Sequence, residues 1–86
     1  MKFKVGDRVK VKSYPDICKI GGEYDSSVGG IPSIYPYSRY YFTDEMKRFC
    51  EKEYKIRYVF PKTKTYNLSP IGDDYGFAEE WLEKVK

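Results

Sequence analysis

The sequence predicts a small all-β domain, built as a closed or nearly closed barrel of about five short antiparallel strands. The chain has 86 residues, the length of one domain, and its 41% of hydrophobic residues suffice for one small core. Charged and apolar residues alternate with a period of two at 8–12 and 53–60, which is typical of half-buried strands. Turn signals containing proline or glycine separate the apolar segments at close spacing, as in antiparallel barrels.

The first predicted strand covers residues 8–12, with Val9 and Val11 pointing inward and basic residues pointing outward. It ends before Pro15, because proline cannot donate a hydrogen bond to a strand ladder. A long first loop follows at 16–43, and its glycines, prolines and serines are typical of irregular structure.

The loop at 16–43 is also rich in isoleucine and tyrosine, which a disordered linker lacks. Loops of this length in a compact domain are usually functional or packed on themselves. We therefore expect an ordered, aromatic-rich insertion whose side chains cover one side of the barrel, with short strand pieces at 34–42.

The second half of the chain contains the longest predicted strand. We expect a helical turn at 43–49, in which Met46 and Phe49 share one face, and then the strand at 53–60. One face of this strand is predicted to carry its alternate apolar side chains, which are Tyr54, Ile56, Tyr58 and Phe60. The other face is predicted to carry Lys55, Arg57 and Val59.

Shorter elements complete the predicted domain. A turn at 61–64 joins the long strand to 65–69 and forms a hairpin, and a short strand follows at 75–77. Residues 78–85 are expected to form a short helix that packs on the barrel through Trp81, Leu82 and Val85.

The order of the motifs is similar to that of a known group of proteins. The chain opens with Gly6-Asp7-Arg8-Val9-Lys10-Val11 and continues, after the loop, with Met46 and Phe49, Lys52, Tyr54-Lys55-Ile56, Tyr66-Asn67-Leu68, Phe77 and Glu80-Trp81-Leu82-Glu83. This ordered set resembles small phage and bacterial proteins with an SH3-like barrel, over residues 3–12 and 42–84. The resemblance implies a five-stranded SH3-like barrel as a single domain over 1–86, with 16–43 inserted and a short C-terminal helical turn. It implies no activity, because the group has no common function to transfer.

One position departs from the pattern of that group. Glu51 stands where those proteins usually have a glycine before the lysine, which is Lys52 in this chain. Glycine adopts a positive φ at little cost, whereas glutamate is strained there, so we expect this turn to have a different shape.

Charge is distributed unevenly along the chain, although the net charge is only +3. Residues 1–12 carry five basic side chains against one acidic one, and residues 73–83 carry five acidic side chains and no basic one. In the simpler interpretation the basic residues form the solvated face of a strand, where lysine prevents aggregation. In the alternative interpretation they form a stripe that contacts nucleic-acid phosphates.

The residue content argues against an enzyme, a metal site and a membrane span. The chain has no histidine, and only Cys18 and Cys50 supply thiols, so we assign no catalytic residue, metal ligand or cofactor. No apolar run approaches the roughly 20 residues of a membrane helix, and the N-terminus lacks the apolar block of a signal peptide. We therefore expect a cytoplasmic protein with reduced cysteines, in the host cytoplasm if a phage encodes it.

A cluster in the loop supplies the candidate binding residues, which are Tyr35, Tyr37, Arg39, Tyr40 and Tyr41. If exposed, such rings would make a protein contact, hold a proline-rich peptide or stack on bases. If buried, they would form a lid over a small core. We expect most of these rings to be buried and one or two to stay exposed.

The leading functional hypothesis is a non-enzymatic binding module that contacts a partner protein through this tyrosine-rich loop. The alternative is a nucleic-acid-binding barrel in which Lys10, Lys12, Lys55 and Arg57 contact phosphates. A third interpretation is structural, a homodimer paired through a barrel edge or the loop. We expect a monomer or a weak homodimer.

Overall fold

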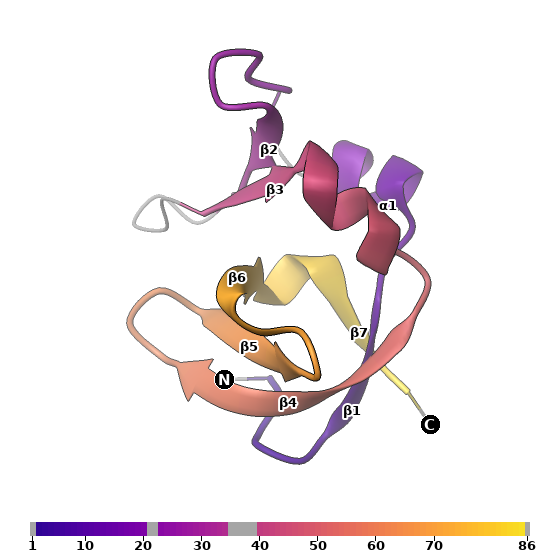
Figure 1. Cartoon of the computed structure of the whole chain (residues 1–86), viewed down its shortest axis with the longest axis vertical. Coiled ribbons are helices and arrows are strands. Elements are labelled where there is room, and N and C mark those ends of the chain that lie inside the picture. The colour runs from indigo at the N-terminus through magenta and orange to yellow at the C-terminus, as the bar shows by residue number, and fades with distance from the viewer. Residues whose placement is uncertain (1, 21–22, 35–39, 86) are drawn as a thin grey trace.

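The computed structural model describes residues 2–20, 23–34 and 40–85, and most of the regular structure is β, as the sequence predicts (Figure 1). One antiparallel sheet has the strand order β6-β5-β4-β1-β7, formed by β1 (Arg8–Val11), β4 (Glu53–Phe60), β5 (Thr65–Ser69), β6 (Gly72–Ala78) and β7 (Leu82–Lys84). A separate hairpin pairs β2 (Gly30–Pro32) with β3 (Tyr41–Thr43). The helical segments are α1 (Tyr14–Ile20) and the 3₁₀ helices η1 (Asp44–Phe49) and η2 (Glu79–Trp81).

The five-stranded sheet curves around the core. In Figure 1, β4 runs below β5 and β6 and then rises toward the hairpin end of the molecule beside β1. Within the part of the chain that the structure describes, no strand pairing joins β6 to β7, so the two ends of the sheet stay unpaired. The domain is small and mostly β, with one curved five-stranded sheet that is not closed by a β6–β7 pairing among the described residues, and a separate two-stranded sheet of β2 and β3.

Residues 14–20 form a helix, which the sequence did not predict. The Ser13 hydroxyl accepts a hydrogen bond from the N–H of Asp16 at 3.4 Å and so caps α1. Pro15 lies in the first turn, where a backbone N–H would have no carbonyl partner within the helix, so the absence of this N–H in proline does not weaken α1. Ile17 is the buried residue of the helix, and through it α1 packs on the core.

The predicted helix at 78–85 is wrong, because only Glu79–Trp81 is helical and the chain then continues as β7. β7 pairs with β1, where Val11 lies opposite Leu82. Since β4 takes only one edge of β1, the other edge would carry unpaired N–H and C=O groups without this strand. The short helical turn that the sequence predicts is thus η2.

A bulge interrupts the pairing of β4 with β5. Ile56 lies opposite Leu68, and the next pair is Tyr58 with Asn67, so Arg57 is an extra residue on β4. Side chains of a strand alternate between the two faces only while the ladder is unbroken, and an extra residue reverses the alternation beyond it.

The bulge corrects the predicted faces of β4. Tyr54 and Ile56 point inward, whereas Tyr58 and Phe60 are exposed and Val59 packs against the core. The prediction that Tyr54, Ile56, Tyr58 and Phe60 share one face is therefore wrong. A prediction based on strict alternation fails beyond Arg57, because the alternating pattern does not allow for an extra residue in the strand.

β6 is irregular in the same region of the sheet. Between Tyr66 and Leu68 on β5, the paired residue on β6 moves from Phe77 to Gly72. The segment 73–76 is therefore longer than the part of β5 that it faces, and it leaves the ladder. This segment and the end of β4 become one wall of the groove described below.

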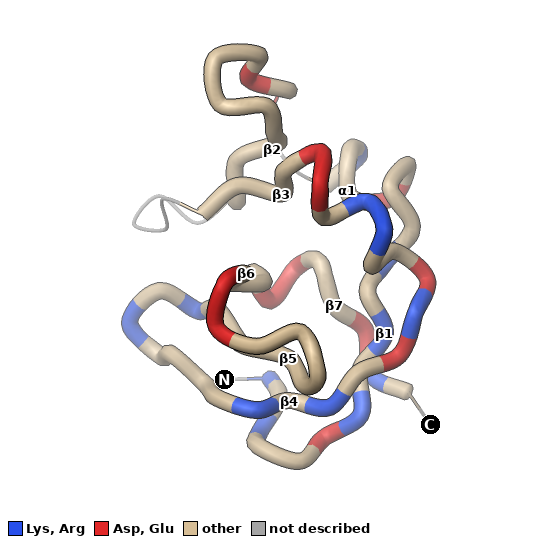
Figure 2. The backbone as a smooth tube through the Cα atoms, viewed as in Figure 1, with Lys and Arg blue, Asp and Glu red and all other residues tan. Residues whose placement is uncertain are grey.

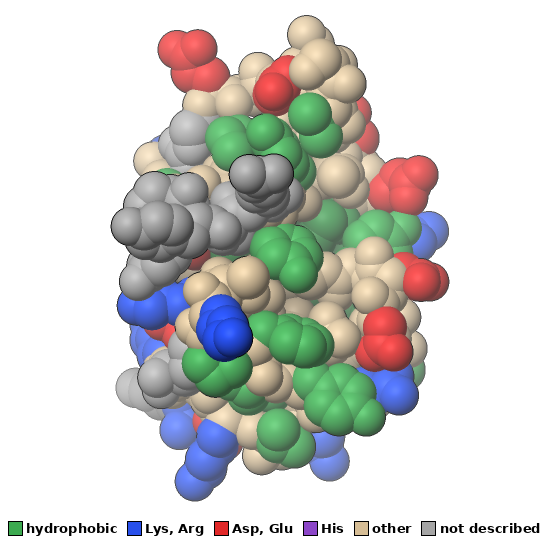
Figure 3. All heavy atoms as spheres, turned by 90° about the vertical axis from the view of Figure 1, so that its left-hand side faces the viewer, with side chains coloured by type: hydrophobic (Ala, Val, Ile, Leu, Met, Phe, Trp, Pro, Cys, Tyr) green, Lys and Arg blue, Asp and Glu red, His purple; other side chains and the backbone are tan. Residues whose placement is uncertain are grey.

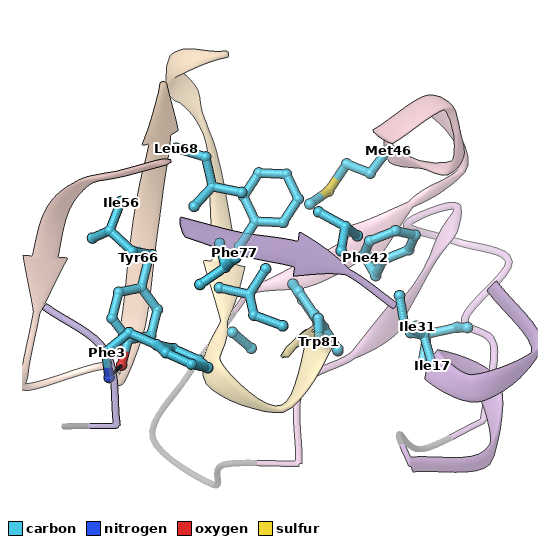
Figure 4. Close-up of a cluster of buried hydrophobic side chains, with 14 residues drawn as sticks. Phe3, Ile17, Ile31, Phe42, Met46, Ile56, Tyr66, Leu68, Phe77 and Trp81 are labelled. Atoms are coloured by element: carbon cyan, nitrogen blue, oxygen red, sulfur yellow. Dashed lines mark hydrogen bonds between the residues drawn. The ribbon is translucent and has the colours of Figure 1, made fainter. Parts of the chain in front are cut away.

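The core joins the sheet to the long insertion (Figure 4). Its 14 buried hydrophobic residues are Phe3, Val9, Val11, Ile17, Ile31, Phe42, Met46, Ile56, Tyr66, Leu68, Phe77, Ala78, Trp81 and Leu82. The ring of Phe42 on β3 meets the edge of the Trp81 indole with their centroids 5.3 Å apart. The insertion therefore supplies part of the core.

The turn before β4 keeps the backbone shape that suits glycine, so the expected change of turn shape does not occur. Glu51 has a φ of 63°, and its N–H donates to the carbonyl of Val11 at 2.7 Å. The Val11 N–H in turn donates to the carbonyl of Lys52 at 3.1 Å. These two bonds fix the turn against β1 in spite of the glutamate.

Glu51→Gly is expected to stabilise the protein by up to about 1 kcal/mol. Relief of the left-handed conformation exceeds the extra entropy that glycine gives to the unfolded chain. Urea unfolding at neutral pH measures the change, with Glu51→Ala as the control that keeps the positive φ and gains nothing. A glycine variant less stable than the alanine variant would contradict this assignment of strain.

Candidate functional site

A groove of about 910 Å³ lies between two parts of the fold. One wall comes from the β2–β3 hairpin and η1, and the other from the bulged parts of β4 and β6. Figure 3 looks onto this side of the molecule, where hydrophobic side chains gather across the face and acidic side chains, with some basic ones among them, lie at its periphery. We call this feature the aromatic groove, and its rings are those of Tyr40, Tyr41, Tyr58, Phe60 and Tyr75.

Exposed apolar side chains concentrate at the aromatic groove. Of the seven large hydrophobic residues exposed in the described chain, the four that line the groove are Val28, Tyr40, Tyr58 and Phe60. A fifth, Tyr24, donates its hydroxyl to Asp44 of the groove wall at 2.7 Å. The remaining two, Val5 and Ile34, do not line it. Contiguous exposed apolar surface on a small protein usually marks a contact site.

The two walls touch where Tyr40 meets Gly76. A Cβ atom at position 76 would lie 2.6 Å from a ring carbon of Tyr40, closer than real Cβ contacts allow. Glycine at this position of β6 therefore lets the ring of Tyr40 lie directly against the backbone. Tyr40 is still 38% exposed, so part of its side chain faces solvent.

Tyr75 joins β6 to η1 at a second point. Its hydroxyl donates to Glu45 Oε2 at 2.7 Å and accepts from Arg48 Nη2 at 3.3 Å. Its ring also packs edge-on against Phe49, with the centroids 5.3 Å apart. These contacts hold the two walls at a fixed separation.

The groove is acidic as well as aromatic. Its described lining contains no lysine or arginine, and its carboxylates are Asp44, Glu45, Asp73 and Asp74. The hydrogen bond donated to Asp44 raises the pKa of Tyr24, and the one donated to Glu45 raises the pKa of Tyr75. Both phenols therefore stay neutral hydrogen-bond donors at physiological pH.

The loop residues proposed from the sequence are placed only in part. Tyr40 and Tyr41 line the aromatic groove. Tyr35, Tyr37 and Arg39 lie outside the described residues. Tyr40 is exposed and Tyr41 is half-buried, so neither forms part of the buried core.

Sequence reasoning missed the opposite wall of the groove. Tyr58 and Phe60 reach it through the bulge in β4, and Tyr75 reaches it on the segment of β6 that leaves the ladder. One signal was present in the sequence, because strict alternation places the aliphatic Val59 on the solvated face. Moving Val59 inward turns both of its aromatic neighbours outward.

The basic residues of the nucleic-acid alternative do not form one uniform patch. Figure 2 shows Lys and Arg along β1 and β4 with acidic residues between them. Lys10 lies 4.0 Å from Glu83, and Arg57 lies 3.8 Å from Asp73. Lys55 is exposed on β4. The fourth residue, Lys12, lines a separate hollow of about 230 Å³ whose wall also includes Lys2, Lys64, Glu79 and Glu80.

The described part of the chain has little other chemistry outside the groove. Cys18 and Cys50 are both free thiols, and burial raises the pKa of Cys50. Within the described ranges, no three cysteine, aspartate or glutamate side chains converge as metal ligands would. Among the helices there, none has the length and apolar character needed to cross a bilayer.

Comparison with known proteins adds no neighbour to this description. No protein-family model, curated protein or solved structure matches the chain. The aromatic groove must therefore be interpreted from its own geometry and charge.

Proposed function

We propose that this protein is a non-enzymatic binding module, and that the aromatic groove holds an extended segment of a partner protein. The observation that carries the proposal is the gathering of exposed rings from separate elements along one groove. Large apolar surfaces exposed to water are costly unless a partner covers them. Tyrosine is also well suited to such a contact, because its rigid ring buries a large area while its hydroxyl remains hydrated.

The shape of the groove favours a peptide segment over a folded surface. Its rings stand on two walls that Tyr40 and Tyr75 connect, so a ligand must fit between the β2–β3 hairpin and β6. An extended chain can enter such a space with one side chain at a time. The buried amide of Asn67, which donates to Asp73 at 3.1 Å, adds a polar group to the lining.

The fold and the cellular setting form part of the same proposal. We propose that the curved sheet is the SH3-like barrel implied by the sequence resemblance. A long insertion between β1 and β4 and a single helical turn before β7 support that interpretation. We further propose a cytoplasmic monomer or weak homodimer, which the two free thiols support because reducing compartments keep cysteines unpaired.

The test uses peptides selected on the protein itself. Random linear peptides displayed on phage are panned against the wild-type protein, and the affinity of labelled binders is measured by fluorescence anisotropy. Tyr58→Ala combined with Phe60→Ala is expected to weaken binding at least about tenfold, because removing a central ring costs about 2 kcal/mol or more. Both side chains are exposed, so the melting temperature should remain close to that of wild type.

Val5→Ala is the matched control, because Val5 is 62% exposed and does not line the groove. Its affinity for the selected peptides should equal that of wild type. Equal losses in the control and the double variant would show that binding occurs elsewhere. Failure to recover any peptide that depends on Tyr58 and Phe60 would also overturn the proposal.

A further inference from the structure

We propose that the segment held in the aromatic groove is cationic, and that its lysine or arginine side chains lie between the groove rings and the groove carboxylates. This inference rests on the proposed function and adds the chemical class of the partner segment. The chain as a whole carries 16 basic residues against 13 acidic ones, yet the described lining of the groove has four carboxylates and no basic side chain. The groove therefore differs in sign from the rest of the protein, and it attracts positive charge.

Among the groove carboxylates, Asp74 is the most available to a ligand, because Asp44, Glu45 and Asp73 already accept hydrogen bonds from Tyr24, Tyr75 and Asn67 respectively. Asp74 makes no ion pair or side-chain hydrogen bond with any residue of the described chain, and its side chain is exposed. Asp73 lies 3.8 Å from Arg57, and Asp44 lies 3.6 Å from Lys47, but more than half of each carboxylate side chain is exposed. Exposed ion pairs of this kind are weak, so a ligand can share or replace them.

The protein already shows the arrangement on one of its own lysines. Lys47 Nζ lies 4.4 Å from the centre of the Tyr14 ring and 3.6 Å from Asp44 Oδ1. A ring face and a carboxylate together thus hold one ammonium group at the edge of the groove. Cations are attracted to ring faces as well as to carboxylates, and the attraction grows when water is excluded. Arg57 repeats the arrangement beside the groove, because its guanidinium lies 5.2 Å from the centre of the Tyr58 ring and 3.8 Å from Asp73. Tyr75 likewise has Arg48 5.9 Å from its ring centre.

The charge also disfavours two other occupants. The phosphates of a nucleic acid would be repelled by four carboxylates in the same groove. A second copy of the chain presents its basic residues on β1 and β4, where Arg8 lies 3.6 Å from Glu53 and Lys10 lies 4.0 Å from Glu83. These basic side chains lie on the surface of a sheet, and a sheet surface enters a groove less readily than an extended segment does.

The experiment measures coupling between one groove carboxylate and one peptide charge. A selected peptide that depends on Tyr58 and Phe60 is made with each lysine or arginine in turn replaced by norleucine, which keeps the apolar stem and removes the charge. Both forms are titrated against wild type, Asp74→Asn and Asp74→Lys. Asp74→Asn is expected to weaken the charged peptide about threefold to tenfold, and Asp74→Lys to weaken it more than about tenfold. One norleucine peptide should bind all three proteins with nearly equal affinity.

Asp16→Asn is the matched control. Asp16 is exposed on α1 and does not line the groove, so this substitution removes the same charge elsewhere on the protein. It should bind the charged peptide as wild type does. The melting temperature of each variant verifies that the fold is intact.

The outcomes separate the two proposals. Selected peptides that are neutral or acidic, but still depend on Tyr58 and Phe60, would overturn the cationic inference and leave the binding groove in place. Equal effects of Asp74→Asn and Asp16→Asn would overturn it as well. A concentration-dependent dimer that Asp74→Lys abolishes, measured by light scattering at low salt, would identify a second copy as the occupant and reject the peptide. Peptides that ignore the groove rings would reject both proposals together.

Discussion

Phe42→Ala is expected to lower the free energy of unfolding by about 3–5 kcal/mol, which is a large share of the total stability of a small domain. Phe42 is fully buried, and its ring packs on Trp81 at 5.3 Å and on Tyr14 at 6.2 Å between centroids. The substitution leaves a cavity where the insertion meets the sheet. Because the chain has a single tryptophan, the fluorescence of Trp81 during urea unfolding measures the loss.

Phe60→Ala is the matched control for the same chemical change at an exposed site. Phe60 is 41% exposed in the aromatic groove, so its removal should change the stability by less than about 0.5 kcal/mol. The pair separates two environments of phenylalanine in this chain, since Phe42 holds the insertion to the core and Phe60 lines the aromatic groove. A Phe42→Ala protein as stable as wild type would show that the insertion does not share the core.

Tyr66→Phe is expected to cost about 1.5–3 kcal/mol, because the hydroxyl of Tyr66 serves two partners. It accepts a hydrogen bond from the Phe3 N–H at 3.1 Å and donates one to Glu79 Oε2 at 2.5 Å. Glu79 also accepts from the N–H of Lys2 at 3.0 Å. Without the hydroxyl, the N-terminal segment loses one of its two bonds to this cluster.

The same cluster makes the stability depend on pH at both ends of the scale. Burial, followed by the bond to Glu79, raises the pKa of Tyr66 from 10.0 to about 12, so its contribution is complete below pH 10 and lost as the pH rises through 12. Burial alone would raise the pKa of Glu79, but the bonds from Tyr66 and Lys2 lower it. Its contribution is therefore present above the ordinary glutamate pKa and lost as the pH falls through the lowered value.

Urea unfolding at a series of pH values tests the cluster. In Tyr66→Phe the alkaline loss of stability should be smaller than in wild type, and the acidic loss should be smaller as well. Tyr58→Phe is the control, because the exposed hydroxyl of Tyr58 makes no hydrogen bond within the described chain. If both variants keep the wild-type pH profile, the hydroxyl of Tyr66 does not determine it.

The sequence predicted those parts of the fold that depend on local alternation. Val9 and Val11 are buried on β1, and Ile56 and Leu68 pair across β4 and β5 as an alternating pattern requires. β7 was predicted as helix instead, because its strand conformation depends on the free edge of β1, which lies far away in the sequence. The residues of one segment do not indicate which strand edge, distant in the sequence, the segment will pair with.

The aromatic groove was predictable only on one side. Tyr40 and Tyr41 were found because they belong to a visible cluster of tyrosines. Tyr58 was missed because a register shift directs it outward, and Tyr75 because it lies where β6 leaves the ladder. A register shift is a property of two paired strands. Residue propensities and hydrophobic periodicity describe each strand separately, so they cannot predict a shift in the register between two strands.

The extra residue at Arg57 makes the length of β4 matter as much as its composition. Loss of one residue at this point would restore an unbroken ladder, turning Tyr58 and Phe60 toward the interior and Val59 toward water. During evolution, one aromatic ring at positions 58 and 60 can therefore replace another with little penalty, whereas a one-codon deletion here removes two side chains from the groove lining at once. Drift in this strand is expected to proceed by substitution, with its residue count held constant.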